Sequence, residues 1–123
     1  MRVASLLAFL AACDARGGEQ ADAAPDAPSP VPVVALDSCP TSVAATVMDS
    51  ATMFIPKEST ISAGSVVKFV IATEHFVIPN TLRTTDPALM IKRGETKCFR
   101  FSVPGEYNFL CGVHSFLGSI TVQ

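Results

Sequence analysis

The 123-residue sequence predicts an all-β domain, a sandwich or barrel of seven or eight short, antiparallel strands. Two observations favour this fold class. Apolar residues alternate with other residues in several segments, which is the period of a strand with one buried face. Turn signals separate these segments, at Ala63-Gly64, Arg93-Gly94 and Pro104-Gly105, and no long segment has the period of a helix.

Residues 1–12 have the composition of an export signal. Arg2 precedes ten residues that are apolar except for Ser5, a run too short for a bilayer, which needs about 20. The sequence Leu10-Ala11-Ala12-Cys13 resembles the lipobox of bacterial lipoproteins, whose cysteine is lipidated. This resemblance implies a lipid anchor at Cys13 and a location at the periplasmic or extracytoplasmic face of a bacterial cell envelope. An ordinary secretion signal with an incidental cysteine is the alternative.

Residues 13–34 are predicted to form a flexible tether rich in Ala, Pro and Asp. From residue 14 onward the segment has four acidic residues and one basic residue, a net charge of −3, and no aromatic residue. Such a composition buries too little apolar surface to offset the entropy of ordering the chain. We expect the tether to hold the following domain away from the membrane.

Residues 35–123 are predicted to fold as one domain. Seven basic and seven acidic residues leave its net charge close to zero. A nucleic-acid-binding protein needs a basic surface, so we expect no nucleic-acid partner. In chain order, strands are expected at residues 43–48, 59–62, 66–72, 89–91, 98–103, 107–110 and 119–122.

The apolar side chains of these segments indicate the core. In residues 66–72 and 98–103 the alternation is clearest, and it directs a set of bulky apolar side chains to one face, namely Val67, Phe69, Ile71, Phe99, Phe101 and Val103. Met48, Met53 and Met90 are expected to fill gaps in the core, because methionine adapts to irregular spaces.

Three of the four cysteines can be assigned from their context. Cys13 belongs to the anchor, and in an oxidising compartment Cys39 and Cys98 are free to form a disulfide. The alternative is that both stay reduced, because connectivity is not fixed by sequence alone. This accounting leaves Cys111 without a partner.

Cys111 and the only two histidines form a candidate metal site. Cys111 and His114 are three residues apart between two expected strands, and His75 follows the strand at 66–72. Two imidazoles and one thiolate are the trigonal ligand set typical of copper electron-transfer sites. Each residue alone has an ordinary explanation, as a small buried thiol or a hydrogen-bonded core histidine. Their coincidence favours one mononuclear copper site.

The domain also resembles the cupredoxins, the family of blue copper proteins that includes plastocyanin, pseudoazurin and amicyanin. The resemblance extends from residue 53 to residue 122. It rests on Phe54-x-Pro56, Ile61-x-Ala63-Gly64, Val67-x-Phe69, His75, Gly94-Glu95, Phe101-x-x-Pro104-Gly105-x-Tyr107 and Cys111-x-x-His114-x-x-Leu117-Gly118-x-Ile120-x-Val122. It implies a Greek-key β-sandwich with one type 1 copper ion bound by His75, Cys111 and His114.

Two positions depart from the family pattern. Leu117 stands where many members have the axial methionine, and leucine does not coordinate, so a raised reduction potential is expected. Phe76 stands where many members have an asparagine that ties the two ligand loops together. The residue that replaces this asparagine is not evident from the sequence.

The resemblance implies a monomeric electron carrier rather than an enzyme. It would exchange single electrons through His114 with a redox partner such as a c-type cytochrome or a membrane oxidoreductase. Val113, Phe116 and Leu117 are expected to form a small apolar docking patch, although Phe116 could equally pack against its own loop. Two other functions stay open: a copper-binding or delivery protein of the envelope without rapid redox cycling, and a metal-free interaction module.

Overall fold

The computed structural model describes residues 30–123. This part of the chain contains nine strands, joined by loops, and no helix. The predicted signal at residues 1–12, the predicted lipidation site Cys13 and most of the predicted tether lie outside the described residues. The strands are β1 (Val33–Ala35), β2 (Ala45–Asp49), β3 (Phe54–Ile55), β4 (Glu58–Ile61), β5 (Ser65–Val70), β6 (Val77–Pro79), β7 (Thr96–Phe101), β8 (Gly105–Cys111) and β9 (Leu117–Val122).

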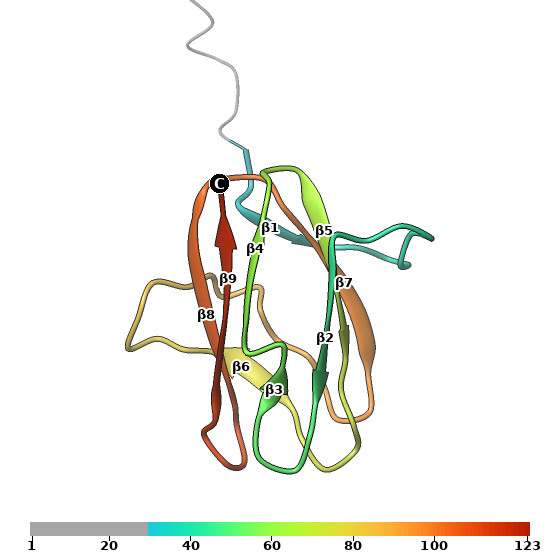
Figure 1. Cartoon of the computed structure of the whole chain (residues 1–123), viewed down its shortest axis with the longest axis vertical. Coiled ribbons are helices and arrows are strands. Elements are labelled where there is room, and N and C mark those ends of the chain that lie inside the picture. Colours follow the sequence, from blue (N-terminus) through green and yellow to red (C-terminus); the bar gives the residue numbers. More distant parts are fainter. Residues whose placement is uncertain (1–29) are drawn as a thin grey trace, which may run out of the picture.

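The strands form two sheets that pack face to face (Figure 1). One sheet has five strands in the order β1-β7-β5-β2-β3, and the other has four in the order β4-β9-β8-β6. The predicted all-β sandwich is therefore confirmed. Val33 and Val34, assigned to the tether above, belong to β1, which pairs with β7 from Val33 opposite Phe101 to Ala35 opposite Phe99.

The expectation of a purely antiparallel sandwich is wrong at two pairings. Strand β2 runs parallel to β5, with Ala45 opposite Val67, and β4 runs parallel to β9, with Glu58 opposite Ser119. The reason is a change of sheet, because the chain leaves the five-stranded sheet after β3, contributes β4 to the other sheet and then returns as β5. Both sheets are consequently mixed.

Phenylalanine rings fill the space between the sheets, as the alternating pattern predicts. Phe54, Phe69, Phe99 and Phe109 are fully buried. Their rings meet edge to face, with centroid separations of 5.0 Å for Phe54–Phe109, 5.3 Å for Phe69–Phe109 and 5.6 Å for Phe69–Phe99. This geometry is the one that aromatic quadrupoles favour. The core therefore ties strands of both sheets together.

The predicted strand at residues 89–91 is not present. Leu89 N–H donates to the Asp86 carbonyl and Met90 N–H to the Ala88 carbonyl, so the backbone turns there. Only Ile91 makes a bridge, to Val77 at the edge of β6. The three methionines expected in the core are also exposed, by 50% for Met48, 45% for Met53 and 55% for Met90. Met48 follows the buried Val47 on β2, so strand alternation directs it outward.

The predicted disulfide between Cys39 and Cys98 is confirmed. Cys98 is buried on β7, on the side opposite Phe99, and Leu36 N–H donates to its carbonyl oxygen. The covalent bond therefore fixes the segment that follows β1 to the five-stranded sheet. Over residues 30–123 we find no helix with the length and apolar character needed to cross a membrane.

Candidate metal centre

The three predicted ligand residues lie at one end of the sandwich, opposite the end at which the described chain begins (Figure 1). Cys111 is the last residue of β8, His114 lies in the loop to β9, and His75 lies between β5 and β6. One ligand atom from each of these side chains lies within 4.8 Å of the other two. His75 and Cys111 are buried, and His114 is exposed. The fold thus joins residues that are 36 and 39 positions apart.

Backbone hydrogen bonds shape the loop that follows Cys111. The Cys111 N–H donates to the Phe116 carbonyl at 2.9 Å, and the Ser115 N–H donates to the Cys111 carbonyl at 2.9 Å. Ser115 has a left-handed backbone, with φ of 63°, which lets the chain turn back into β9. These hydrogen bonds therefore join the two ends of the loop that contains His114.

A main-chain hydrogen bond ties this loop to the His75 segment. The Gly112 N–H donates to the Phe76 carbonyl at 3.0 Å. The Phe76 ring lies over Gly112, because a β-carbon added to Gly112 would be 2.1 Å from a ring atom. The backbone and ring of Phe76 therefore join the two ligand segments where many cupredoxins use an asparagine side chain.

Asp49 is a residue of the candidate site that the sequence did not reveal. It ends β2, and its Oδ2 lies 2.5 Å from His75 Nδ1, while its Oδ1 accepts the Ala72 N–H at 3.0 Å. The two side chains are only 3% and 5% exposed. A carboxylate on one ring nitrogen orients an imidazole and leaves the other nitrogen for a metal. Here Nδ1 contacts Asp49, so Nε2 is the nitrogen left for coordination.

Phe116 packs inside the site rather than lying free on the surface. Its ring centroid is 4.8 Å from that of Phe54 and 5.2 Å from that of His75, and it stacks on His114 at 6.3 Å. It is half-buried, whereas Val113 and Leu117 are 43% and 39% exposed. Two of the three residues expected in the docking patch are therefore exposed beside His114.

Leu117, the residue expected at the axial position, is the first residue of β9 and is 39% exposed. The next residues of β9 alternate, with Gly118, Ile120 and Val122 buried, so Leu117 belongs to the outer face of the sheet. It does not line the hollow, about 490 Å³ in volume, that opens on His75 and His114. The apolar side chain that packs against both imidazole rings is Phe116.

The chemistry of the donor set fits a copper ion. A buried thiol and two imidazoles are soft and borderline ligands, which suit copper better than the hard cations magnesium and calcium. Ligand bonds of about 2.0 to 2.3 Å hold the donors of one ion within about 4.5 Å of one another. The three candidate ligand atoms, which lie within 4.8 Å of one another, are close to that spacing.

Comparisons with known proteins agree with this fold. No protein-family model and no curated protein matches the chain. Among solved structures, amicyanin from Paracoccus versutus (Thiobacillus versutus) aligns with a TM-score of 0.58 and 16% identity, over 75% of this chain and 98% of its own. An oxidised methionine-to-leucine mutant of amicyanin aligns with a TM-score of 0.58 and 13% identity. The Cu(I) form of a methionine-to-alanine mutant of amicyanin aligns with a TM-score of 0.60 and 15% identity. Both alignments cover 76% of this chain and 100% of the amicyanin chain.

The fold and the His-Cys-His group together define the class of structure. The described domain has the cupredoxin fold, with its candidate ligands clustered at one end of the sandwich. The particular proteins that it resembles in these comparisons are amicyanins. Because the identities are between 13% and 16%, this likeness concerns the fold.

Proposed function

We propose that this protein is a mononuclear type 1 copper protein that carries single electrons between redox partners. The observation that carries the proposal is the convergence of His75, Cys111 and His114, whose ligand atoms lie within 4.8 Å of one another. The fold supports it, because one of the amicyanin structures that it resembles is described as a Cu(I) form. An enzyme is disfavoured, because the sequence has no further histidine for a second metal centre.

Hydrogen bonds would hold the proposed ligands in place. Asp49 fixes the His75 ring, and the Gly112–Phe76 hydrogen bond fixes the two ligand segments relative to each other. Cys111 would supply the thiolate, and the two histidines would supply neutral imidazole nitrogens. A bound copper ion would supply one-electron redox chemistry at this point. Because the ligand segments are tied into two sheets, they would rearrange little if a bound copper ion changed oxidation state, and this would favour rapid electron transfer.

His114 provides the route to the surface. It is exposed, whereas His75 and Cys111 are buried, so its ring edge is the shortest connection between the site and a docked protein. The exposed Val113 and Leu117 beside it offer a small apolar contact for a transient partner, such as a c-type cytochrome or a membrane oxidoreductase. The near-neutral domain implies weak long-range steering.

The location in the cell is part of the proposal. The residues Leu10-Ala11-Ala12-Cys13 support lipidation at Cys13 and attachment to the bacterial envelope. The disulfide between Cys39 and Cys98 supports an oxidising compartment. We therefore propose a lipid-anchored carrier on the periplasmic or extracytoplasmic face.

A copper titration followed by visible absorption tests the proposed function. The expected result is one ion bound per chain and an intense thiolate-to-copper charge-transfer band, which the variant Cys111→Ser loses. Cys13→Ser is the matched control, because it replaces a cysteine that is not one of the proposed ligands and should leave the band unchanged.

The same preparation separates the alternatives. Absence of the band from the wild-type protein would contradict the type 1 site and favour a metal-free interaction module. A band together with slow electron self-exchange would favour copper binding or delivery instead of electron transport.

A further inference from the structure

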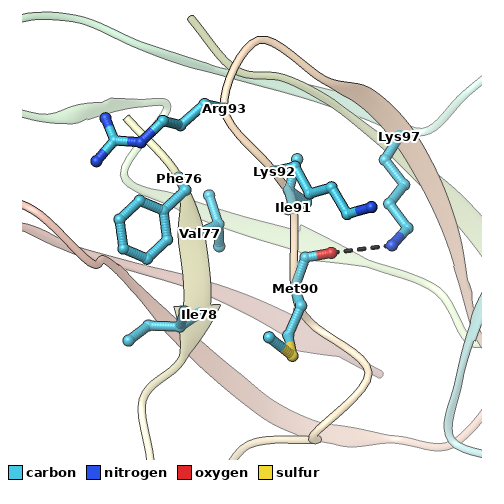
Figure 2. A pocket seen from close by; sticks show the side chains of 8 residues that line it. All are labelled: Phe76, Val77, Ile78, Met90, Ile91, Lys92, Arg93 and Lys97. Atoms are coloured by element: carbon cyan, nitrogen blue, oxygen red, sulfur yellow. Dashed lines mark hydrogen bonds between the residues drawn. The ribbon is translucent and has the colours of Figure 1, made fainter. Parts of the chain in front are cut away.

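A second surface feature lies beside the metal site, on the edge strand β6 (Figure 2). Val77 and Ile91 form a two-residue bridge through hydrogen bonds of 2.9 and 3.0 Å, and both side chains are buried. The neighbours of Ile91, Met90 and Lys92, are exposed, and the neighbours of Val77, Phe76 and Ile78, are half-buried. These neighbours line an open groove with a volume of about 640 Å³.

The floor of the groove is apolar and uncovered. Phe76 and Ile78 lie along one side, and Met90 lies opposite them (Figure 2). Met90 is 55% exposed, and the Phe76 and Ile78 side chains are only half-buried. Grouped apolar side chains of this kind on a water-facing edge are typical of binding surfaces.

The rim of the groove is basic. Lys92, Arg93 and Lys97 line it, and no acidic residue does. Within residues 30–123, none of these three side chains lies within 4.0 Å of a carboxylate oxygen. Lys97 Nζ donates to the Met90 carbonyl at 3.0 Å, and Arg93 lies over the Phe76 ring at 5.0 Å while donating to the Glu74 carbonyl. Three cations thus surround an apolar floor without a direct ion pair to any described residue, and a nearby carboxylate, that of Glu95, accepts the Lys92 backbone N–H at 2.8 Å.

The groove is also connected to the candidate metal centre. Phe76 follows His75 in the chain, and its carbonyl oxygen accepts the Gly112 N–H, one residue from Cys111. One hydrogen bond and a few covalent bonds therefore separate the groove from the thiolate ligand. This connection is independent of the exposed His114 edge.

We propose that the groove is a docking surface for an acidic segment of a redox-partner protein. An apolar side chain of the partner would enter between Phe76, Ile78 and Met90, and flanking carboxylates would meet the basic rim. The charge complementarity and the connection to Cys111 carry this assignment, which rests on the proposed electron-carrier function. It is distinct from the patch of Val113 and Leu117 around His114.

Peptide binding to the full chain tests the proposal without copper. The probe is a fluorescein-labelled hexapeptide, Glu-Asp-Leu-Phe-Asp-Glu, followed by fluorescence anisotropy. Weak binding that decreases with salt is expected. Lys92→Glu combined with Arg93→Glu should weaken binding by about tenfold, because two attractions become repulsions. Met90→Glu should weaken it as well, and the remote, exposed Lys57→Glu is the control that should leave it unchanged.

Several outcomes would overturn the proposal. One is no peptide binding, and another is equal binding of the basic peptide Lys-Lys-Leu-Phe-Lys-Lys. A third is binding to phosphatidylglycerol vesicles that the Lys92→Glu, Arg93→Glu variant loses, which would assign the groove to an anionic membrane. A fourth is self-association that the same variant abolishes, measured by sedimentation. Because none of these measurements needs copper, their failure is distinguishable from failure of the proposed function.

Discussion

Asp49 and His75 form a buried pair in which a carboxylate oxygen lies 2.5 Å from the Nδ1 atom of the imidazole. They come from the end of β2 and from the segment between β5 and β6, and the Ala72 N–H holds the carboxylate from its other side. The pair places a negative charge directly behind a proposed copper ligand. It therefore makes Asp49 a positioning residue whose effect on the site can be measured.

Replacing Asp49 should weaken the site in two measurable ways. Asp49→Ala should lower copper affinity by about 10- to 100-fold, because His75 loses the group that fixes its ring. The reduction potential should rise, because loss of the carboxylate makes the imidazole a poorer donor to the cupric state. Asp49→Asn can still accept the Nδ1–H hydrogen bond and should retain most of the affinity. The exposed Asp37→Asn is the control, and an unchanged potential in Asp49→Ala would contradict this role.

Methionine substitutions should identify the side chain nearest the proposed axial position. Because Leu117 lies on the outer face of β9, Leu117→Met should leave the potential and the visible spectrum unchanged. Phe116 packs against both imidazole rings, so Phe116→Met should bring a thioether toward the metal and lower the potential. Potentiometry on both copper-loaded variants decides between them. A lowered potential in Leu117→Met alone would instead place residue 117 at the axial position, as expected from the sequence.

The disulfide should contribute a large part of the stability of the domain. Cys39 and Cys98 are 59 positions apart, and closing such a loop contributes about 4 kcal/mol on the chain-entropy model. Urea denaturation of the double variant Cys39→Ser, Cys98→Ser should show a loss of that order. Cys13→Ser, which removes a cysteine outside this pair, should behave as the wild type. A change below about 1 kcal/mol would indicate that the bond contributes little.

Tyr107 should make the domain less stable at alkaline pH. Its hydroxyl donates to the Val103 carbonyl at 2.6 Å, and burial, followed by the nearby Asp86 carboxylate, raises the pKa of Tyr107 above the usual 10.0. Since the folded pKa exceeds the unfolded one, this stabilisation is complete below about pH 10 and is lost as pH rises through the folded pKa.

Tyr107 is the only tyrosine in the sequence, so its ionisation can be followed directly by ultraviolet absorption. Tyr107→Phe should lower stability at neutral pH by about 1 kcal/mol through loss of the hydrogen bond, and it should flatten the alkaline decrease. The measurement is the denaturation midpoint of the wild-type protein and of Tyr107→Phe, each at a pH below and a pH above the ionisation of Tyr107. A tyrosinate titration at or below the usual pKa would show that the phenol is not stabilised in its neutral form.

Local patterns in the sequence explain what could be predicted. The alternation of apolar residues gives the strands around Phe69 and Phe99 and the shared Phe core, because burial on one face has a period of two. The ligand cluster could also be predicted, because Cys111 and the only two histidines all lie at or next to the ends of expected strands. These inferences need only short-range information and the rarity of the residues.

Long-range geometry explains what could not be predicted. Asp49 is 26 positions from His75, and nothing in its neighbourhood distinguishes it from other acidic residues. The parallel pairing of β2 with β5 depends on a change of sheet by the chain between them. The packing of Phe116 against both imidazole rings occurs in a loop with a left-handed Ser115, a conformation that sequence spacing does not reveal.

The described chain enters the sandwich at the end opposite the metal centre (Figure 1). Strand β1 pairs with the last part of β7, whereas Asp49, His75 and the loop after Cys111 lie at the far end. Any attachment through the residues upstream of β1 would therefore connect to the end of the sandwich that lies away from the candidate metal centre. If Cys13 carries the proposed lipid anchor, the end of the domain with the exposed His114 would be the end more accessible to other proteins.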